Sequence, residues 1–449
     1  MASPISNLAL NFEVKRYDPQ LVVPSKPTPR EVKKLSDVDD QEGTKLLVPA
    51  IWFHKNDDKP SMEGKDPVRV IKDALGRVLV YYYPLAGRLK RGANGELMVD
   101  CNEEGVLFIE ADADVTLQQL GTIQPPFLFL HKVLYNVPGS DGIFGCPLLL
   151  IQVTRLKCGG FIFAIRFNHP MTDGLGIAQF TISLSEMARG AEQPSVLPVW
   201  QRELLDDPNP PQVTHHDVHH QNNDDKVIHL DFSDMVHGSF DFSPNELRDV
   251  RKHLPSHLAS CTRSELLTAC VWKCRTLALN LDQEEVVQLL IVFDGRGKSN
   301  GLSLPSGYYG NVGMALPVVS KAGDICTNPL AYVVELVMNT KSQFKAKYTR
   351  SVADFMRRRG GPDLKIKENY VVSDVTKLPV GEVDFGWGCP EYGGPAISSP
   401  FNCYFVKSAA KVDDGILLVA CFPSLLMKRF RRELKKMMSG PISIKHSKL

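Results

Sequence analysis

A histidine and an aspartate lie four positions apart in the stretch Asn168-His169-Pro170-Met171-Thr172-Asp173-Gly174. Histidine titrates close to neutral pH, so its ring can take a proton from a hydroxyl group while that oxygen attacks a carbonyl carbon. Such a base needs a fixed ring orientation, which a hydrogen bond to its second nitrogen usually supplies. Asp173 could make that bond, but it also stands where the next helix needs an N-cap, and it could pair with a buried arginine. The spacing therefore leaves two interpretations of Asp173 open, a catalytic partner or a structural brace.

A second unusual stretch, Asp384-Phe385-Gly386-Trp387-Gly388, lies in the last fifth of the chain. Its Asp-Phe-Gly start also occurs in protein kinases, but the glycine-rich loop, the strand lysine and the His-Arg-Asp loop of a kinase are missing from this sequence. Two glycines around one tryptophan instead indicate a tight loop that a single large side chain holds in place.

The elements around His169 can be predicted from the spacing of apolar residues. In residues 161–167, large apolar side chains alternate with others, which is typical of a strand that faces a core. After the turn, Ile177, Phe180, Leu184 and Ala188 recur at helical spacing and predict a helix over 175–189. We therefore expect His169 at the turn between a buried strand and an amphipathic helix, where its ring can face a cleft.

Other helix starts carry clear capping signals. Asp66-Pro67 combines an N-cap residue with proline at the first helical position. Thr262-Arg263-Ser264-Glu265 is a capping box and predicts a helix to about residue 279, whose first turn could meet a polar ligand or could simply be well capped. Further helices are expected over 329–348, with Asn328 as its cap, and over 424–438. Strands are expected over 46–54, 106–111, 147–154, 227–232, 289–293, 370–373 and 414–421.

The length of 449 residues exceeds one ordinary hydrophobic core, so two domains are expected. Proline, asparagine and aspartate accumulate between residues 193 and 225, which marks a change from packed elements to a connection. The predicted division is a first domain over 1–195, a crossover over 196–225 and a second domain over 226–446.

The composition excludes several classes of function. Lys and Arg number 52 against 51 Asp and Glu, so no excess of positive charge indicates binding to nucleic acid or to an anionic membrane. No apolar run has the length needed to span a bilayer. Ten cysteines are spread over the whole chain without a paired spacing, and we expect them to be reduced.

The sequence ends in Ser447-Lys448-Leu449. This tripeptide is the peroxisomal import signal when it stands at the very C-terminus, where a receptor binds it. We therefore expect a peroxisomal location and an interaction with the import receptor.

The two motifs together, His169-x-x-x-Asp173-Gly174 upstream and Asp384-Phe385-Gly386-Trp387-Gly388 downstream, resemble the BAHD family of plant acyl-CoA-dependent acyltransferases. Their order, their wide separation and the chain length all match. Three further stretches resemble the branch of alcohol acyltransferases within this family: Leu35-Ser36-Asp37-x-Asp39-Asp40, Tyr82-Tyr83-Pro84-Leu85-Ala86-Gly87-Arg88 and Leu304-Pro305-x-Gly307-Tyr308-Tyr309-Gly310-Asn311.

The resemblance implies an α/β, two-domain fold like chloramphenicol acetyltransferase, with mixed sheets flanked by helices and an active-site channel between the domains. His169 would be the general base, and no metal or cofactor would be required, because acyl-CoA is a co-substrate. Asp173 would pair with Arg296, and Ser264 would line the pantetheine arm of CoA. Asp384 is sometimes assigned as a second proton acceptor in this family, but we expect the whole loop, with Phe385, Gly386, Trp387 and Gly388, to be structural.

The implied activity is transfer of a benzoyl group from CoA to a small alcohol such as benzyl alcohol, by a monomeric enzyme. The alternatives are an acyltransferase for an aliphatic or alkaloid alcohol with another acyl-CoA, and a binding protein on the same fold. Two departures from the family pattern bear on the site, because Asp294-Gly295-Arg296 replaces Asn-Ala-Arg and Gly174 replaces a common alanine. At Val372-Ser373-Asp374 the sequence also lacks the Thr-Ser-Trp of the hydroxycinnamoyl branch, which argues against shikimate or quinate as the acceptor.

Overall fold

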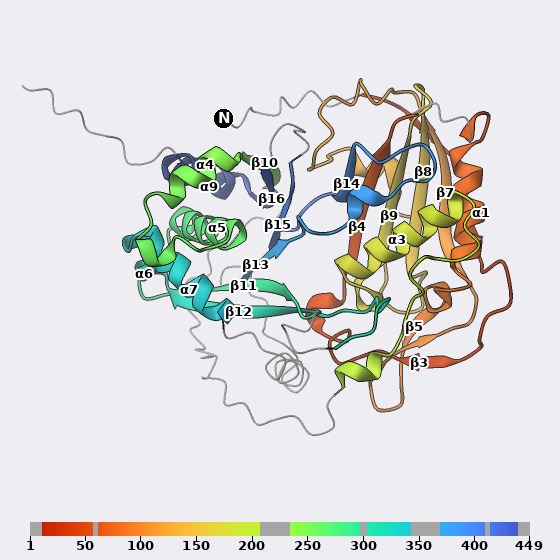
Figure 1. Cartoon of the computed structure of the whole chain (residues 1–449), viewed down its shortest axis with the longest axis horizontal. Coiled ribbons are helices and arrows are strands. Elements are labelled where there is room, and N and C mark those ends of the chain that lie inside the picture. The colour runs from red at the N-terminus through yellow and green to blue at the C-terminus, as the bar shows by residue number, and fades with distance from the viewer. Residues whose placement is uncertain are drawn as a thin grey trace, which may run out of the picture.

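The computed structural model describes residues 11–56, 62–206, 234–296, 303–342, 369–408 and 414–438. Two sheets lie side by side, each with its own helices (Figure 1). The predicted crossover, 196–225, is described only to residue 206, and the predicted strand over 227–232 and the tripeptide at 447–449 lie outside the described residues. Within the described parts of the chain, no helix is both long enough and apolar enough to cross a membrane.

The first sheet has seven strands in the order β1-β7-β8-β9-β4-β14, with β2 also paired to β7. The strands and helices of this half are β1 (Val14–Arg16), β2 (Gln20–Val22), β4 (Leu47–His54), α1 (Pro67–Val78), β7 (Val106–Ala113), α2 (Leu130–Val133), β8 (Leu149–Leu156), β9 (Phe161–Asn168) and α3 (Gly174–Ala188). A small third sheet is formed by β3 (Val32–Lys34), β6 (Leu97–Asp100) and β5 (Arg88–Arg91).

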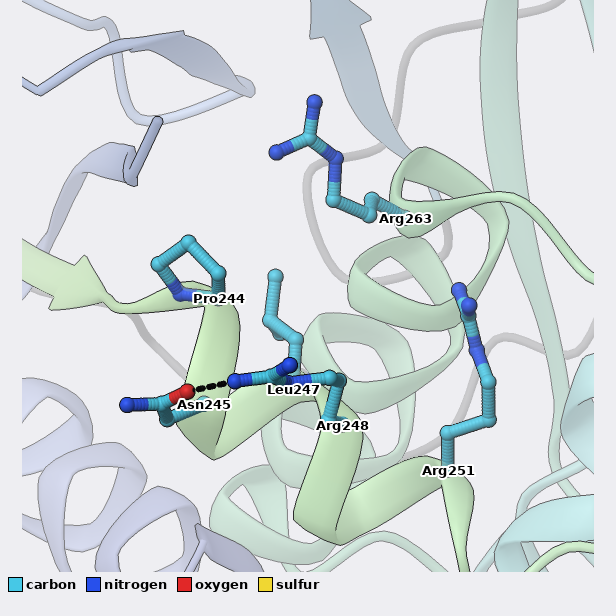
Figure 2. A pocket seen from close by; sticks show the side chains of 6 residues that line it. All are labelled: Pro244, Asn245, Leu247, Arg248, Arg251 and Arg263. Atoms are coloured by element: carbon cyan, nitrogen blue, oxygen red, sulfur yellow. Dashed lines mark hydrogen bonds between the residues drawn. The ribbon is translucent and has the colours of Figure 1, made fainter. Parts of the chain in front are cut away.

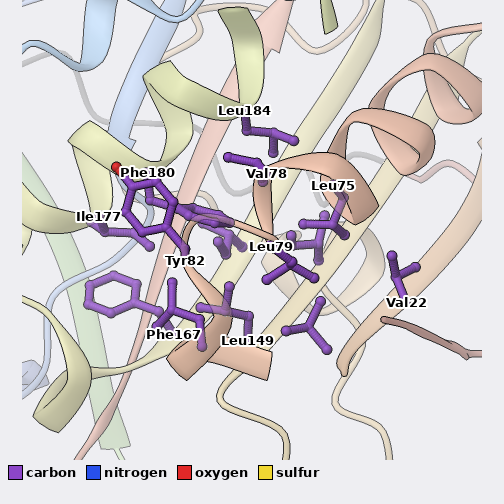
Figure 3. Packing of buried hydrophobic residues seen from close by; sticks show 14 of the residues in the cluster. Val22, Leu75, Val78, Leu79, Tyr82, Leu149, Phe167, Ile177, Phe180 and Leu184 are labelled. Atoms are coloured by element: carbon purple, nitrogen blue, oxygen red, sulfur yellow. The ribbon is translucent and has the colours of Figure 1, made fainter. Parts of the chain in front are cut away.

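Strand β9, which leads to His169, is buried on both faces. Phe161, Phe163 and Phe167 belong to the core that α1 and α3 cover, in which Figure 3 shows Phe167. Ile162 and Ala164 belong to a second cluster on the opposite face. The strand pairs antiparallel with β4 on one side and with β8 on the other. The predicted alternation is therefore present, and the strand is fixed in register before the chain turns at His169.

The second half is built in the same way around a six-stranded sheet in the order β10-β16-β15-β13-β11-β12. Its elements are β10 (Met235–Phe242), α4 (Pro244–Arg251), α5 (Arg263–Leu279), β11 (Val286–Asp294), β12 (Gly313–Lys321), α6 (Ala322–Thr327), α7 (Leu330–Ser342), β13 (Asn369–Asp374), β15 (Asn402–Lys407), β16 (Ile416–Pro423) and α9 (Ser424–Met438). In β16, Ile416, Leu418 and Ala420 face the helices, and Leu417 and Val419 face the other way.

One strand of the second half of the sequence belongs to the first sheet. β14 (Tyr392–Pro395) pairs antiparallel with β4, as the blue strand beside β4 in Figure 1 shows. The Trp52 indole on β4 donates a hydrogen bond to Val380 O at 2.8 Å. The segment that carries the Asp384 loop therefore packs with the first half, although we predicted it as part of the second domain. The order of the elements in the sequence does not indicate that β14 joins the first sheet.

Most predicted helices and strands are present, with ends shifted by up to three residues. Several strands were not predicted, among them β10, β12 and β15, and Asn328 was wrongly predicted as an N-cap. Its backbone N–H donates to Asp324 O, so it ends α6 instead of starting α7. All ten cysteines are free, and Cys158 and Cys389 are exposed.

Candidate active site

His169 stands at the first residue of a short 3-10 helix, His169–Met171, that follows β9 directly. Its backbone N–H donates to Leu46 O at 3.0 Å, which anchors the turn to the start of β4. Pro170 fits the second position of such a turn because its ring fixes φ and the missing N–H needs no partner there. The predicted position of His169, between a buried strand and a helix, is the one that the structure shows.

The two ring nitrogens of His169 lie in different surroundings. Nδ1 is buried and has no hydrogen-bond partner among the described residues, although the residue as a whole is only partly buried. Burial lowers the pKa of His169 below its usual value, and the nearby carboxylates of Asp173 and Asp39 oppose this effect only in part. The ring is therefore neutral at neutral pH, which is the form that can accept a proton.

The Asp173 carboxylate is fully occupied by other groups. As the N-cap of α3, its Oδ1 accepts hydrogen bonds from Leu175 N at 3.1 Å and Gly176 N at 3.0 Å. Its Oδ2 accepts from Val312 N at 3.1 Å. The Arg296 guanidinium donates to both oxygens, at 2.9 Å and 3.0 Å. These bonds leave the carboxylate facing protein groups and not the His169 ring.

The electrostatics of this ion pair follow from its burial. Burial alone would raise the pKa of Asp173, but the charge and hydrogen bonds of Arg296 outweigh it and lower that pKa, so the carboxylate is ionised. Asp294, the departure from the family pattern, accepts a further bond from Arg296 at 3.1 Å. The structure thus contains the Asp173–Arg296 pair that the resemblance implied, and Asp294 adds to it and does not replace it. The role of the Asp173–Arg296 pair in turnover stays a prediction.

Gly174 lies against the second half of the chain. A Cβ atom at this position would come within 3.0 Å of Leu378 Cδ1, so an alanine here requires a small shift of the leucine side chain. Gly176 is more restrictive, because a Cβ atom would lie 2.1 Å from Tyr309 O. The same atom would lie 2.2 Å from Thr172 Oγ1, so both the turn and a distant segment require glycine at this position, which was not singled out from the sequence.

The Asp384 carboxylate stabilises its own loop. Its Oδ1 accepts hydrogen bonds from Gly386 N at 2.7 Å and Gly388 N at 2.8 Å. Both glycines have positive φ angles, +114° and +101°, which other residues rarely adopt. This combination of a capping carboxylate and two glycines explains three of the five residues of the motif.

The two aromatic residues of the same loop fill the first core. Phe385 is buried against Phe163, with ring centroids 5.0 Å apart, and Trp387 packs edge-on against Phe161 at 5.4 Å. Asp384 O accepts a hydrogen bond from Arg189, which ends α3, whereas His169 precedes the start of α3. The 15 residues of α3 span about 22 Å, so the loop lies a helix length away from the candidate base. This separation favours the structural role of Asp384 that we expected.

Ser264 lies in the first turn of α5, after the N-cap Thr262, and is partly exposed. The predicted capping box is present, with Glu265 as its second member. Beside this turn a hollow of about 230 Å³ is lined by Arg248, Arg251 and Arg263 (Figure 2), although Arg263 is already paired with Asp414. The contact of Ser264 with CoA stays a prediction.

A larger hollow, of about 640 Å³, lies beside Trp387. Neither hollow is lined by His169, so the channel at this residue also stays a prediction.

The segment Tyr309 to Val312, whose first three residues end a stretch that resembles the alcohol acyltransferase branch, contacts the His169 turn and the Arg296 that braces it. Tyr309 O accepts a hydrogen bond from the Thr172 hydroxyl at 2.8 Å, and Gly310 O accepts one from Arg296 at 2.7 Å. The Asn311 side-chain amide donates to His169 O at 2.9 Å, and Val312 N donates to Asp173. In the sequence, the resemblance of residues 304–311 to the alcohol acyltransferase branch marked this segment, but no pattern indicated that it contacts His169.

Metal ligands do not converge at this site. In the parts of the chain that the structure describes, no group of three or more His, Cys, Asp or Glu side chains is placed to hold a metal ion. The expectation that acyl transfer here needs no metal remains a prediction.

Comparisons with known proteins agree with the motifs. The model of the Transferase family matches residues 12–437. The chain is 49% identical to benzyl alcohol O-benzoyltransferase of Petunia hybrida, over 98% of this chain and 96% of that protein. It is also 49% identical to alcohol acyltransferase 16 of Actinidia chinensis var. chinensis, over 97% of both chains.

Among solved structures, vinorine synthase has the same fold, with a TM-score of 0.73 at 20% identity over 95% of this chain and 98% of that one. TRI101 of F. sporotrichioides, solved with coenzyme A and T-2, gives a TM-score of 0.69 at 18% identity over 90% of this chain and 98% of that one. The two-domain fold expected from the resemblance is therefore confirmed.

Proposed function

Because the chain belongs to the Transferase family, the BAHD acyltransferases that its motifs resemble, we propose that it is an acyl-CoA-dependent alcohol O-acyltransferase. The observation that carries this proposal is the His169 ring, which is neutral, has a buried Nδ1 and belongs to a partly exposed residue at the end of β9. A histidine in this state can act as a general base toward an alcohol.

The proposed reaction is a direct transfer without an acyl-enzyme. His169 Nε2 takes the proton of the alcohol as the alcohol oxygen attacks the thioester carbonyl carbon, which forms a tetrahedral intermediate. The C–S bond then breaks, CoA leaves as the thiolate, and the proton on His169 returns to that sulfur. Asp173 and Arg296 take no part in the proton transfer, because their charged groups bind each other and the backbone.

We propose benzoyl-CoA as the acyl donor and benzyl alcohol as the leading acceptor. The petunia enzyme and a tobacco benzyl alcohol O-benzoyltransferase, 50% identical over 96% of this chain, support this choice. Alcohol acyltransferases of Actinidia chinensis var. chinensis and Malus domestica are equally similar, at 49% identity, and their names specify no benzoyl donor. The alternative, an aliphatic or alkaloid alcohol with another acyl-CoA, therefore stays open. Overall identity therefore does not decide between the two.

A matrix of acyl-CoA donors and alcohols, with product analysis, tests this assignment. We expect benzyl benzoate to form with the highest kcat/KM in the matrix. Efficient transfer of another acyl group without any benzoate ester would contradict the donor assignment, although the acyltransferase class would stand. No transfer from any donor to any alcohol would contradict the class itself.

We also propose that the protein is a peroxisomal monomer and that Ser447-Lys448-Leu449 binds the import receptor. Benzoyl-CoA can be made in that organelle by chain shortening of cinnamoyl-CoA, so the donor and the enzyme would be in one compartment. Deletion of Leu449 should move a fluorescent fusion, tagged at its N-terminus, from punctate bodies to the cytosol without loss of activity. Unchanged punctate fluorescence of the Leu449 deletion would contradict the peroxisomal location. Light scattering of the purified protein measures its mass, and the mass of a dimer would contradict the monomer.

A further inference from the structure

A buried ion pair lies directly behind the His169 turn. Arg202 Nη1 donates to the two carboxylate oxygens of Asp39 at 2.9 Å and 3.1 Å. The side chains are 1% and 0% exposed, so solvent does not share in the pair. Three segments far apart in the sequence meet here, because Asn311 also binds Asp39, through its backbone N–H at 3.0 Å and its side-chain amide at 2.8 Å.

This cluster of Asp39, Arg202 and Asn311 holds three successive carbonyl oxygens of the turn. The Asn311 amide donates to His169 O at 2.9 Å and to Pro170 O at 3.1 Å. Arg202 Nη2 donates to Met171 O at 2.8 Å. The turn therefore has no carbonyl in this run that is left to solvent, and each one is bound by a side chain that Asp39 holds in place.

Both members of the Asp39–Arg202 ion pair are also fixed by other contacts. Asp39 Oδ2 accepts two more bonds, from Ser36 N at 2.9 Å and from the Ser36 hydroxyl at 2.7 Å. The Arg202 guanidinium packs on the Trp200 ring at 4.5 Å and on the Tyr309 ring at 5.1 Å. With so many fixed partners, the plane of the guanidinium has one orientation, and so does the carbonyl that it binds.

Gly310 links this cluster to the Asp173 brace. A Cβ atom at Gly310 would lie 1.7 Å from Arg202 Nη1, so only glycine lets the chain pass over the guanidinium. The carbonyl oxygen of the same residue accepts the bond from Arg296. The turn is thus held on its carbonyl side by Arg202 and Asn311, and on its helix side by Asp173 and Arg296.

Stability alone does not explain a buried ion pair at this place. Removing two charges from water costs about as much as their attraction returns, and apolar side chains of the same volume are often as stable. What a charged network with this many hydrogen bonds does provide is one fixed geometry. Its hydrogen bonds here converge on the residue that carries the candidate base.

We propose that Arg202, Asp39 and Asn311 are positioning residues for acyl transfer, which set the place of His169 through the carbonyl oxygens of its turn. The inference rests on the proposed function, because it assigns these residues a part in that reaction. None of them touches the reacting atoms. Their effect is to keep Nε2 where the hydroxyl proton must be taken, and a displacement of about 1 Å at such an atom can cost about 100-fold in rate.

Arg202→Lys tests the proposal in the full-length protein. Lysine keeps the charge but lacks the planar fork that reaches Asp39 and Met171 O together. We expect kcat to fall by about 10- to 100-fold in folded protein, with KM for both substrates changed by less than about threefold. Asn311→Ser, which shortens the amide donor, should give the same division between kcat and KM.

Arg88→Lys is the matched control. Arg88 is also a buried arginine, which donates to Gly87 O at 2.7 Å and Gly105 O at 2.8 Å and pairs with Glu104, but it belongs to the small sheet. We expect this variant to lose melting temperature while kcat per folded molecule stays within about twofold of wild type. Unchanged kcat in Arg202→Lys and Asn311→Ser would overturn the proposal. Failure of both variants to fold would overturn it as well, because the cluster would then serve the fold.

A readout without turnover separates this proposal from the proposed function. The ¹⁵N resonances of the His169 ring can be assigned by their loss in His169→Ala. We expect them to shift in Arg202→Lys and to stay in place in Arg88→Lys, whether or not an acyl group is transferred. A wild-type protein without transfer but with these shifts would contradict the reaction only. A wild-type protein with transfer and unmoved resonances in Arg202→Lys would contradict the positioning role only.

Discussion

At the scale of single residues, Asp173 shows how a motif with catalytic spacing serves a structural purpose. Its carboxylate caps α3 and accepts hydrogen bonds from both terminal nitrogens of Arg296, so no lone pair is left to orient the His169 ring. The spacing in the sequence allowed either role. Only the position of Arg296, more than 100 residues away along the chain, decides between them, and no local pattern could place that arginine.

Asp173→Asn should therefore act first on stability. Asparagine still caps a helix, but it removes the carboxylate charge that pairs with the nearly buried Arg296. We expect a loss of about 3 kcal/mol in the free energy of unfolding, with a lower melting temperature and a lower soluble yield. Chemical denaturation measures this loss, and activity is compared per folded molecule. A large loss of rate in a protein of unchanged stability would contradict the role as a brace.

His54 gives the fold a dependence on pH. Burial of the ring, which stacks on Phe161, lowers the pKa of His54 to about 4, although the contact of Nδ1 with Gly388 O at 3.2 Å and the charge of Asp384 oppose this shift. The unfolded chain, with a histidine pKa of about 6.5, binds more protons between pH 4 and pH 6.5, so stability is lost as the pH falls through that window.

We expect the contribution of His54 to this loss to reach about 2 kcal/mol between pH 7 and pH 5. His54→Gln cannot ionise, so its free energy of unfolding should fall less than that of wild type over the same range. Denaturation curves at the two pH values measure both proteins. Equal losses in the two would show that His54 is not the group responsible.

At the scale of elements, hydrophobic spacing predicted β9, α3 and α9 to within about two residues, and the capping box predicted α5 equally well. The same spacing missed β10 and β12. In β10, glycine, serine and aspartate alternate with the apolar residues, and in β12 a proline interrupts the run. Their strand character comes from pairing with β16 and β11, which is a property of the sheet and not of the segment.

The Asp384 loop is an element whose role two substitutions at one position can distinguish. Asp384→Asn keeps an oxygen that can accept from Gly386 N and Gly388 N, whereas Asp384→Ala removes it. We expect the asparagine variant to keep most of the melting temperature and of kcat, and the alanine variant to lose about 1 to 3 kcal/mol of stability. Calorimetry and the pH profile of kcat/KM measure both. Loss of a limb of that profile in the asparagine variant would support a proton-accepting role.

At the scale of the whole molecule, two segments from the second half of the sequence pack against the first half. The segment with β14 and the Asp384 loop enters the first core, and residues 309–312 bind the His169 turn. The position of neither segment could be predicted from composition or periodicity, because each depends on contacts between residues more than 100 positions apart in the sequence. The motifs could be found from the sequence, since they resemble a family. The physical reason for each glycine, asparagine and arginine in them required the packed structure.

The central claim is that His169 is the base that removes the alcohol proton. The most direct measurement is kcat of His169→Ala with the best donor and acceptor of the substrate matrix, in protein whose melting temperature matches wild type. A positioned general base contributes about 10²- to 10⁴-fold, so the variant should lose at least about 100-fold in kcat. Full turnover by folded His169→Ala would contradict the claim.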